Sequence, residues 1–319
     1  MQQGSWVQGV RSGQGTFTSP NGQDVYEGNF SNDEFHGAGV HQLGSVGEIF
    51  EGNFVRGHLE GVGRWSRSGE EWFEGSFRKG LRSGRGALYT KSESGQKQLV
   101  YEGDWSDGRP HGRGVLALSV DGDGNTRLSA QYEGDISDGR PHGDGVCAYS
   151  NGTHYSGQWR RGLRNGSGKF TAANGDVYDG KWIADKRCGK GTWTSHRGDV
   201  YAGVWENNLP HGAGRFTYIS GETYTGEWVA GKHHGEGTLN HTDGSEYSGS
   251  FAYGAPHGKG TWRGPARADG EVAYTGDWKD GARSGYGTAT YASGDVYSGA
   301  FANDRASSSS SPASNSRRK

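Results

Sequence analysis

"YEGDWSDGRPHGRGV", residues 101–115, returns as "YEGDISDGRPHGDGV", residues 132–146, with two of fifteen positions changed. The phrase contains Asp, Arg and His, residue types that are common in catalytic and metal sites. A catalytic site is built once in a chain, whereas a structural unit is repeated. The number of copies therefore decides how the phrase is interpreted.

The phrase recurs through the chain with an underlying period of 23 residues. Each copy reads aromatic, any, Gly, any, Trp or Phe, and continues with a polar stretch and a Gly-x-Gly pair. A degenerate copy with Gln2 in the aromatic place comes first, and a truncated copy comes last. The opening aromatic residues are Tyr26, Phe50, Phe73, Tyr101, Tyr132, Tyr155, Tyr178, Tyr201, Tyr224, Tyr247, Tyr274 and Tyr297.

The spacing within one copy predicts two β-strands. With the opening aromatic as position 0, the aromatic, Gly and Trp or Phe stand at positions 0, 2 and 4, and a second segment places Gly, Gly and a bulky residue at positions 11, 13 and 15. A spacing of two puts these residues on one face of a strand. Positions 5–10 form a polar turn, so each copy is a hairpin. A helix this rich in Gly would lose about 1 kcal/mol per Gly relative to Ala.

The composition fits a thin core. The chain has 319 residues, of which 61 are Gly and 30% are hydrophobic, whereas about 45–50% is typical of globular domains. Aromatic residues nevertheless make up 12% of the chain, and disordered chains contain few of them. No apolar run reaches the roughly 20 residues of a membrane helix, so we expect a cytoplasmic protein without a transmembrane segment.

The aromatic residues should form one continuous core stripe. Ten of the eleven Trp residues stand at position 4 or 15, and only Trp72 does not. Burial of one large side chain stabilises by roughly 1.5–3 kcal/mol, but a single hairpin cannot bury its own, so neighbouring hairpins must stack. The stripe is predicted to contain Tyr101, Trp105, Tyr155, Trp159, Tyr178, Trp182, Trp193, Tyr201, Trp205, Tyr224, Trp228, Tyr274 and Trp278.

Copies such as "YSGQWRRGLRNGSGKF" (155–170) and "YTGEWVAGKHHGEGTL" (224–239) resemble MORN (membrane occupation and recognition nexus) repeats. The resemblance covers nearly the whole chain. It implies an all-β fold, an elongated and twisted antiparallel sheet of tandem hairpins, which often dimerises through terminal repeats. MORN arrays occur beside enzymatic domains, in junctional membrane proteins, and alone in cytoskeletal and ciliary structures. We predict a stand-alone array of about twelve repeats over residues 2–303.

Residues 304–319 are predicted to be a disordered, Ser-rich, basic tail. The last hairpin breaks off near Asn303, which would leave an unpaired strand edge, and natural proteins usually pair or cover such edges. We therefore predict a homodimer formed through the C-terminal repeats, with Tyr297 and Phe301 at the dimer edge.

The chain shows no convincing site for a catalytic group, metal or cofactor. "GEWVAGKH" (226–233) resembles a phosphate-binding loop but has His where Ser or Thr must bind magnesium, and "DGDGN" (121–125) lacks the turn Gly of a calcium loop. Histidines at position 10 would lie about 9–10 Å apart in successive hairpins, too far to share one zinc ion. This column contains His36, His111, His142, His211, His234 and His257.

Two features differ between copies. Extra residues enter three units at the inter-hairpin turn, at 91–97, 119–129 and 263–271, and such insertions often form a binding edge. Several hairpin turns are basic and could bind acidic lipid headgroups or an acidic protein surface, although solvated turn residues explain them equally well. These residues are Arg78, Lys79, Arg82, Arg85, Arg160, Arg161, Arg164, Lys186, Arg187 and Lys190.

These observations favour a non-enzymatic scaffold or assembly protein without a cofactor, associated with a cytoskeletal or ciliary (flagellar) structure, because repeat arrays offer long binding surfaces. The alternative is a peripheral membrane adaptor that binds acidic phospholipids, such as phosphoinositides, through the basic turns. An enzyme or enzyme-activating module is the third class. We expect protein partners and no nucleic acid.

Overall fold

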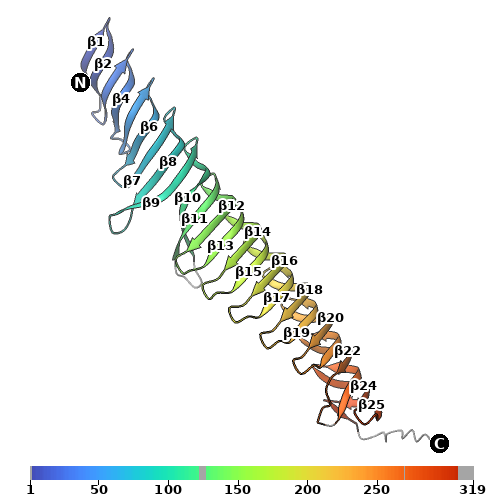
Figure 1. Ribbon diagram of the computed structural model, residues 1–319. Coiled ribbons are helices and arrows are strands. Elements are labelled where there is room, and N and C mark those ends of the chain that lie inside the picture. Colours follow the sequence, from blue (N-terminus) through green and yellow to red (C-terminus); the bar gives the residue numbers. More distant parts are fainter. Residues whose placement is uncertain (1, 122–126, 269, 308–319) are drawn as a thin grey trace, which may run out of the picture. The chain divides into compact units, whose positions relative to one another are not determined.

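The computed structural model (Figure 1) describes residues 2–121, 127–268 and 270–307, and these residues contain 26 β-strands and no helix. The chain divides into two compact units, residues 1–163 and 164–319. Within each unit every strand pairs antiparallel with the next strand in the chain, as Figure 1 shows. The predicted all-β fold of tandem antiparallel hairpins is confirmed.

The strands of the first unit are β1 (Gln2–Val7), β2 (Val10–Thr18), β3 (Asp24–Ser31), β4 (Glu34–Leu43), β5 (Glu48–Val55), β6 (His58–Arg67), β7 (Glu71–Arg78), β8 (Leu81–Lys91), β9 (Lys97–Ser106), β10 (Arg109–Asp121), β11 (Arg127–Ser137), β12 (Arg140–Tyr149) and β13 (His154–Arg160). The strands of the second unit are β14 (Leu163–Thr171), which begins at the boundary, β15 (Val177–Ile183), β16 (Lys186–Thr194), β17 (Val200–Glu206), β18 (Leu209–Thr217), β19 (Thr223–Val229), β20 (Lys232–Asn240), β21 (Glu246–Ala252), β22 (Ala255–Arg263), β23 (Glu271–Lys279), β24 (Ala282–Tyr291), β25 (Val296–Ala302) and β26 (Arg305–Ala306).

The turn inside each hairpin is shorter than the sequence predicts. In the opening phrase, Asp107 (φ 49°) and Gly108 (φ 81°) alone form the loop between β9 and β10. Two successive positive φ angles are typical of a type I′ turn, whose twist matches that of the flanking strands. Pro110, predicted to lie in the turn, is already part of β10 and pairs with Trp105. The predicted turn at positions 5–10 therefore narrows to positions 6 and 7.

Tyrosine and tryptophan rings build the core. Tyr201 is 1% exposed, and its ring meets those of Trp205 (5.1 Å, 88°) and of Trp228 in the next repeat (5.1 Å, 79°). Such edge-to-face pairs contribute about 0.5–1.5 kcal/mol beyond the burial of area. The Tyr201 hydroxyl donates a hydrogen bond to the carbonyl of Val204 at 2.8 Å. Tyr201 thus joins its own repeat to the following one.

Glycine makes room for these rings. Gly203 and Gly214 pair with each other on β17 and β18, and a Cβ on either residue would overlap the ring of Tyr201. The carbonyl of Gly214 in turn accepts a hydrogen bond from the indole N–H of Trp228 in the next repeat, at 3.2 Å. The same Trp-to-Gly bond, 3.0–3.2 Å long, is made by Trp105, Trp159, Trp182, Trp205, Trp228 and Trp278.

Two details differ from the sequence prediction. Of the thirteen residues assigned to the core stripe, Trp193 is only half-buried, while the other twelve are buried. The hairpins also continue past residue 303, because Arg305 and Ala306 form β26 and pair with Ala302 and Phe301. The start of the segment predicted to be a disordered tail is therefore ordered, and residues 308–319 lie outside the described residues.

Candidate binding surface

The face of the sheet opposite the aromatic core is polar and repeats with the hairpins. In the first unit, the residue after the opening aromatic is glutamate in five repeats, and alternation along the strand directs it away from the core. These glutamates are all exposed, and successive ones are separated by two strands, about 9–10 Å. We call them the glutamate column; its members are Glu27, Glu51, Glu74, Glu102 and Glu133.

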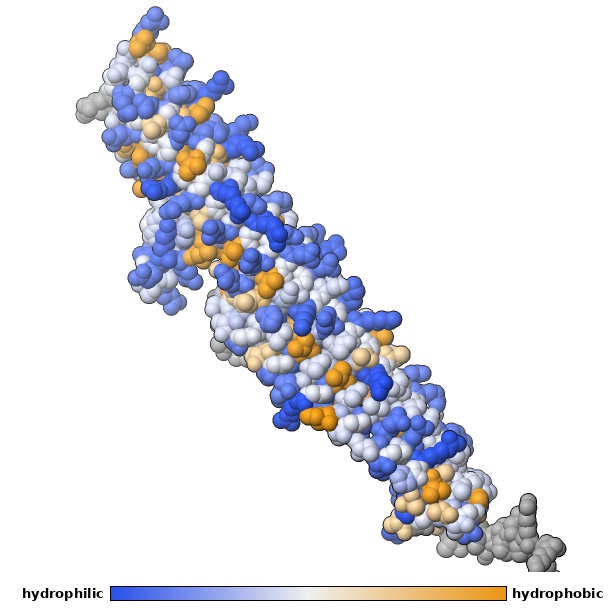
Figure 2. Space-filling model, in the orientation of Figure 1, coloured by the Kyte–Doolittle hydropathy of each residue, from blue (hydrophilic) through white to orange (hydrophobic). Residues whose placement is uncertain are grey.

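Ion pairs cross between neighbouring strands of this polar face. Arg85 lies 3.5 Å from Asp104, and Lys259 lies 2.6 Å from Asp277. A hydrogen bond from Lys259 is the main reason why the pKa of Asp277 is lowered. Exposed pairs of this kind contribute about 0.2–1 kcal/mol each. They help to set the register, and they leave the face charged and hydrated. Figure 2 likewise shows hydrophilic residues over much of the visible surface, with hydrophobic residues scattered among them.

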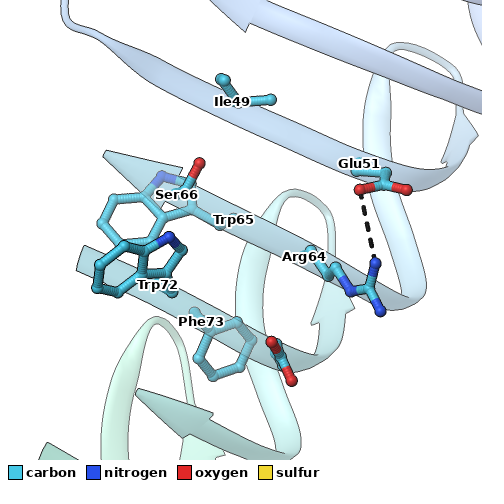
Figure 3. Close-up of a pocket in the computed structure, with 8 residues that line it drawn as sticks. Ile49, Glu51, Arg64, Trp65, Ser66, Trp72 and Phe73 are labelled. Atoms are coloured by element: carbon cyan, nitrogen blue, oxygen red, sulfur yellow. Dashed lines mark ion pairs between the residues drawn. The ribbon is translucent and has the colours of Figure 1, made fainter. Parts of the chain in front are cut away.

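A pocket on this face in the first unit (Figure 3) has a volume of about 180 Å³. Its lining comes from neighbouring strands β5, β6 and β7. We call it the Trp72 pocket; its outward-facing residues are Ile49, Glu51, Arg64, Ser66, Trp72 and Glu74. Trp72 is the tryptophan that falls outside the repeat pattern, so the sequence already marks this place as unusual.

The basic residues proposed from the sequence do not form one class. Seven are exposed, namely Arg78, Lys79, Arg85, Arg160, Arg161, Lys186 and Lys190. Arg82, Arg164 and Arg187 are instead half-buried against aromatic rings. Their guanidiniums lie 4.3 Å from Trp65, 4.3 Å from Trp182 and 4.4 Å from Trp205, respectively. Burial lowers the pKa of Arg82 and Arg187. These three were wrongly predicted to be turn cations, because the turns are shorter than predicted.

The three arginines belong to a packing layer at position 9 that the sequence analysis missed. Arg187 lies over Trp205, and its Nη2 donates a hydrogen bond to the carbonyl of Asn208 at 2.9 Å. The backbone N–H of Arg187 donates to Asn208 Oδ1 at 2.8 Å. The sequence signal was an Asp or Asn about 21 residues after an Arg. It recurs in Arg11 with Asp33, Arg164 with Asp185, and Arg283 with Asp304.

This layer predicts unequal effects for two neighbouring basic residues. Arg187→Ala should lower the free energy of unfolding by about 2 kcal/mol, because stacking on Trp205 and a charged hydrogen bond are both lost. Lys186→Ala, in the same hairpin but exposed, should change it by less than about 0.5 kcal/mol. Urea unfolding followed by circular dichroism measures both changes. Equal effects would show that Arg187 is an ordinary surface residue.

The predicted dimer edge is placed differently by the structure. Phe301 is 4% exposed, packs against Tyr274 and is paired through its backbone with Ala306. Tyr297 is half-buried. β26 thus pairs with the end of β25 at Phe301 and Ala302, so the Phe301 side chain is buried and its backbone is already paired within the chain. Homodimerisation through the C-terminal repeats stays a prediction.

The three insertions behave differently from one another. Residues 91–97 link β8 to β9 through a turn in which the N–H of Ser92 donates to the carbonyl of Gln96 at 2.8 Å. Most of the middle of 119–129 lies outside the described residues. The insertion at 263–271 packs onto the core: Arg267 lies 3.8 Å from the Trp262 ring, and buried Glu271 pairs with Arg283. Through Arg267 and Glu271 this insertion contacts the core of the second unit.

Among the described residues, no group of His, Cys, Asp and Glu is arranged to hold a metal ion. In the same part of the chain, no helix is long and apolar enough to cross a membrane.

The repeat seen in the structure matches a known family. The profile of the MORN repeat fits the chain twelve times, at residues 3–23, 26–45, 50–69, 73–92, 101–119, 132–154, 155–177, 178–200, 201–223, 224–246, 247–266 and 274–296. The chain belongs to the MORN repeat family. The twelve matches agree in number with the repeats predicted from the sequence. The MORN repeats make this chain a repeat-based binding or scaffold protein in its general class.

Curated relatives share part of this MORN array. Alsin from Rattus norvegicus is 30% identical over 117 residues, which is 35% of this chain and 7% of Alsin. Alsin from Mus musculus and from Homo sapiens match over the same extent. The match therefore spans a small part of those proteins. Among solved structures, virginiamycin B lyase from Staphylococcus aureus is 9% identical over 90% of this chain and 83% of that one, with a TM-score of 0.14, which supports no inference.

Proposed function

We propose that this MORN array is a non-enzymatic scaffold that binds protein partners of a cytoskeletal or ciliary structure through its polar face. The glutamate column is the main support. It presents one exposed carboxylate in each of five successive repeats of the first unit, which suits a partner that is itself extended or repetitive. The aromatic core supports the same proposal, since the rings are used for stacking repeats and the polar face stays available for binding.

A fractionation experiment tests this proposal. A tagged full chain is expressed in ciliated cells, which are extracted first without and then with detergent. We expect most of the wild-type protein to stay in the detergent-insoluble fraction. Replacing all five residues of the glutamate column by Gln should release it, because the carboxylates that bind the partner are gone. A diffuse protein that is fully extracted without detergent would contradict the scaffold.

A matched control separates the column from net charge. The residue after the opening aromatic in five repeats of the second unit is uncharged, and changing all five to Lys alters the net charge by the same five units as neutralising the glutamates. This variant should remain insoluble. The residues changed to Lys are Ala202, Thr225, Ser248, Thr275 and Ser298. If both variants are released equally, net charge and not the glutamate column holds the protein in place.

The same fractionation experiment distinguishes binding to lipid from binding to a protein scaffold. The seven exposed basic residues motivate the alternative of a peripheral adaptor for acidic phospholipids, each charge near such a membrane being worth about 1 kcal/mol. A lipid-bound protein would sediment without detergent and be released by it. In that case Arg160→Glu with Arg161→Glu, both at exposed positions, should reduce sedimentation with vesicles that contain phosphoinositide.

A further inference from the structure

Trp72 differs from the other tryptophans of the chain in its surroundings. It precedes Phe73 on β7, so it faces away from the core, and it is paired with Ser66 on β6 and Tyr89 on β8. Six core tryptophans donate their indole N–H to a glycine carbonyl. Within the described residues, the indole N–H of Trp72 donates to no protein atom. The half-buried Trp72 ring is therefore left without the acceptor that buried indoles normally find. Within the described residues Trp193, on the core face, is also half-buried and also lacks this bond.

Two carboxylates line the same pocket as this ring, one row of paired residues away from it. Glu51, Arg64 and Glu74 stand next to one another in register on β5, β6 and β7. The dashed line in Figure 3 marks the ion pair of Arg64 with Glu51, whose atoms are 3.9 Å apart with both side chains more than half exposed. Such a pair is worth little. A hydrogen bond from Lys97 is the main reason why the pKa of Glu74 is lowered, so this carboxyl stays ionised.

Two other parts of the chain show which chemical group lies between an aromatic ring and a carboxylate. Arg267 lies 3.8 Å from the ring of Trp262, and its Nη1 is 3.8 Å from a carboxylate oxygen of Glu271. On the polar face, Lys97 lies 3.9 Å from the ring of Tyr89 and 2.8 Å from Glu74. A cation between an aromatic ring and a carboxylate is thus the arrangement that this chain builds repeatedly. No cation among the described residues lies over Trp72.

The size of the pocket limits the ligand. Pockets for cofactors and drug-sized molecules measure about 300–1,000 Å³, whereas this one measures about 180 Å³. It suits a single side chain. We propose that the Trp72 pocket binds an arginine side chain of a partner protein, with the guanidinium stacked on the indole and hydrogen-bonded to the carboxylates of Glu51 and Glu74. This inference rests on the proposed function in one respect, namely that the ligand is part of a protein.

Arg64 and Lys97 are the native competitors for this site, since Lys97 lies 2.8 Å from Glu74. The Arg64 guanidinium shares the Glu51 carboxylate, and it places a positive charge beside the incoming one. Removing Arg64 should therefore strengthen binding, whereas removing the carboxylates should weaken it. Opposite effects from neighbouring residues are not expected if the substitutions only perturb the fold.

The test uses the full chain labelled with 5-fluorotryptophan, which gives one fluorine resonance for each of eleven tryptophans. Trp72→Phe assigns the resonance of interest by removing it. Titration with N-acetyl-arginine amide should shift this resonance in a saturable way. The isosteric but uncharged N-acetyl-citrulline amide should not. Trp6, which is 51% exposed, is an exposed indole in the same chain and serves as an internal control that should not saturate.

Substitutions of the charged pocket residues test how the ligand is bound. Glu51→Gln with Glu74→Gln should weaken binding about tenfold, the effect of losing charged hydrogen bonds. Arg64→Ala should tighten it about threefold, the effect of removing one exposed ion pair. Unchanged resonances of the other tryptophans report that each variant is folded.

Several outcomes would overturn the proposal. They are an equal response to citrulline amide, a parallel shift of Trp6, weaker binding after Arg64→Ala, and a shift caused by cellohexaose but not by arginine amide. The last would make the pocket a sugar platform. Since the titration needs no cell, its failure is separate from a failure of the fractionation experiment.

Discussion

Tyr201→Ala is expected to lower the free energy of unfolding by about 3–5 kcal/mol, the usual range for removing a large aromatic side chain from a core. Tyr201 is 1% exposed and contacts the rings of Trp205 and Trp228. The substitution leaves a cavity between two repeats. Gly203 and Gly214 border this cavity, and they have no side chain that could fill it. The substitution therefore weakens the packing between two repeats as well as the packing within one hairpin.

Two further variants separate the causes. Tyr201→Phe keeps the ring and removes only the 2.8 Å hydrogen bond to Val204, so it should cost about 1 kcal/mol. Thr225→Ala, on the exposed face of β19, should cost less than about 0.5 kcal/mol. Urea unfolding followed by both circular dichroism and tryptophan fluorescence checks the values and whether one transition describes them. A loss below that of Tyr201→Phe would contradict the core described above.

The hairpins and most of the core could be predicted from the sequence because both depend on alternation. Tyr201, Gly203 and Trp205 are two residues apart, and a strand must place them on one face. The glycines on the core face could also be predicted, because the rings need space that only a residue without a side chain leaves. Trp193 follows the same alternation but is half-buried, because alternation gives the face of a residue and not the depth of its burial.

The binding surface was less predictable, and the reason is the length of the turn. With positions 5–10 assigned to a turn, Arg187 was interpreted as a solvated cation. The loop in fact consists of Ala184 and Asp185, both with positive φ, so the strand restarts at Lys186 and directs Arg187 back onto the core. A turn of two non-glycine residues is hard to see in a sequence. Lys186 is also a strand residue, but it is exposed, as expected from the sequence.

In the sequence, the only sign of the Trp72 pocket was that Trp72 does not fit the repeat pattern. The sequence shows that Trp72 breaks the pattern, but not that it shares a pocket with Glu51 and Glu74, because Glu51 comes from a different repeat and is brought close through strand pairing. Register between repeats is fixed by the length of each inter-hairpin turn. A column such as the glutamate column therefore becomes apparent once the strands are paired.

Strongly alkaline solution, above about pH 10, should unfold the array cooperatively. Burial raises the pKa to about 12 for Tyr26, Tyr101, Tyr178, Tyr201, Tyr224 and Tyr274, and further for Tyr132 and Tyr247. In the unfolded chain a tyrosine ionises near pH 10. Below that pH both states are neutral and the full stability is present. Above it the unfolded state loses protons that the folded state keeps, so stability falls as the pH rises toward the folded pKa.

The effect should be large, because the free energy of unfolding falls steeply with pH above about pH 10. Each tyrosine contributes up to about 1.4 kcal/mol per pH unit above pH 10, so eight give up to about 11 kcal/mol per unit, against total stabilities of about 5–15 kcal/mol. Phenolate absorbance and far-ultraviolet circular dichroism should therefore change together between about pH 10 and 12. Tyr201→Phe should make this transition shallower. Phenolate formation that is complete while the sheet signal persists would mean that the rings are accessible to hydroxide without unfolding. The stacked tyrosines could not then be the continuous core that joins one repeat to the next.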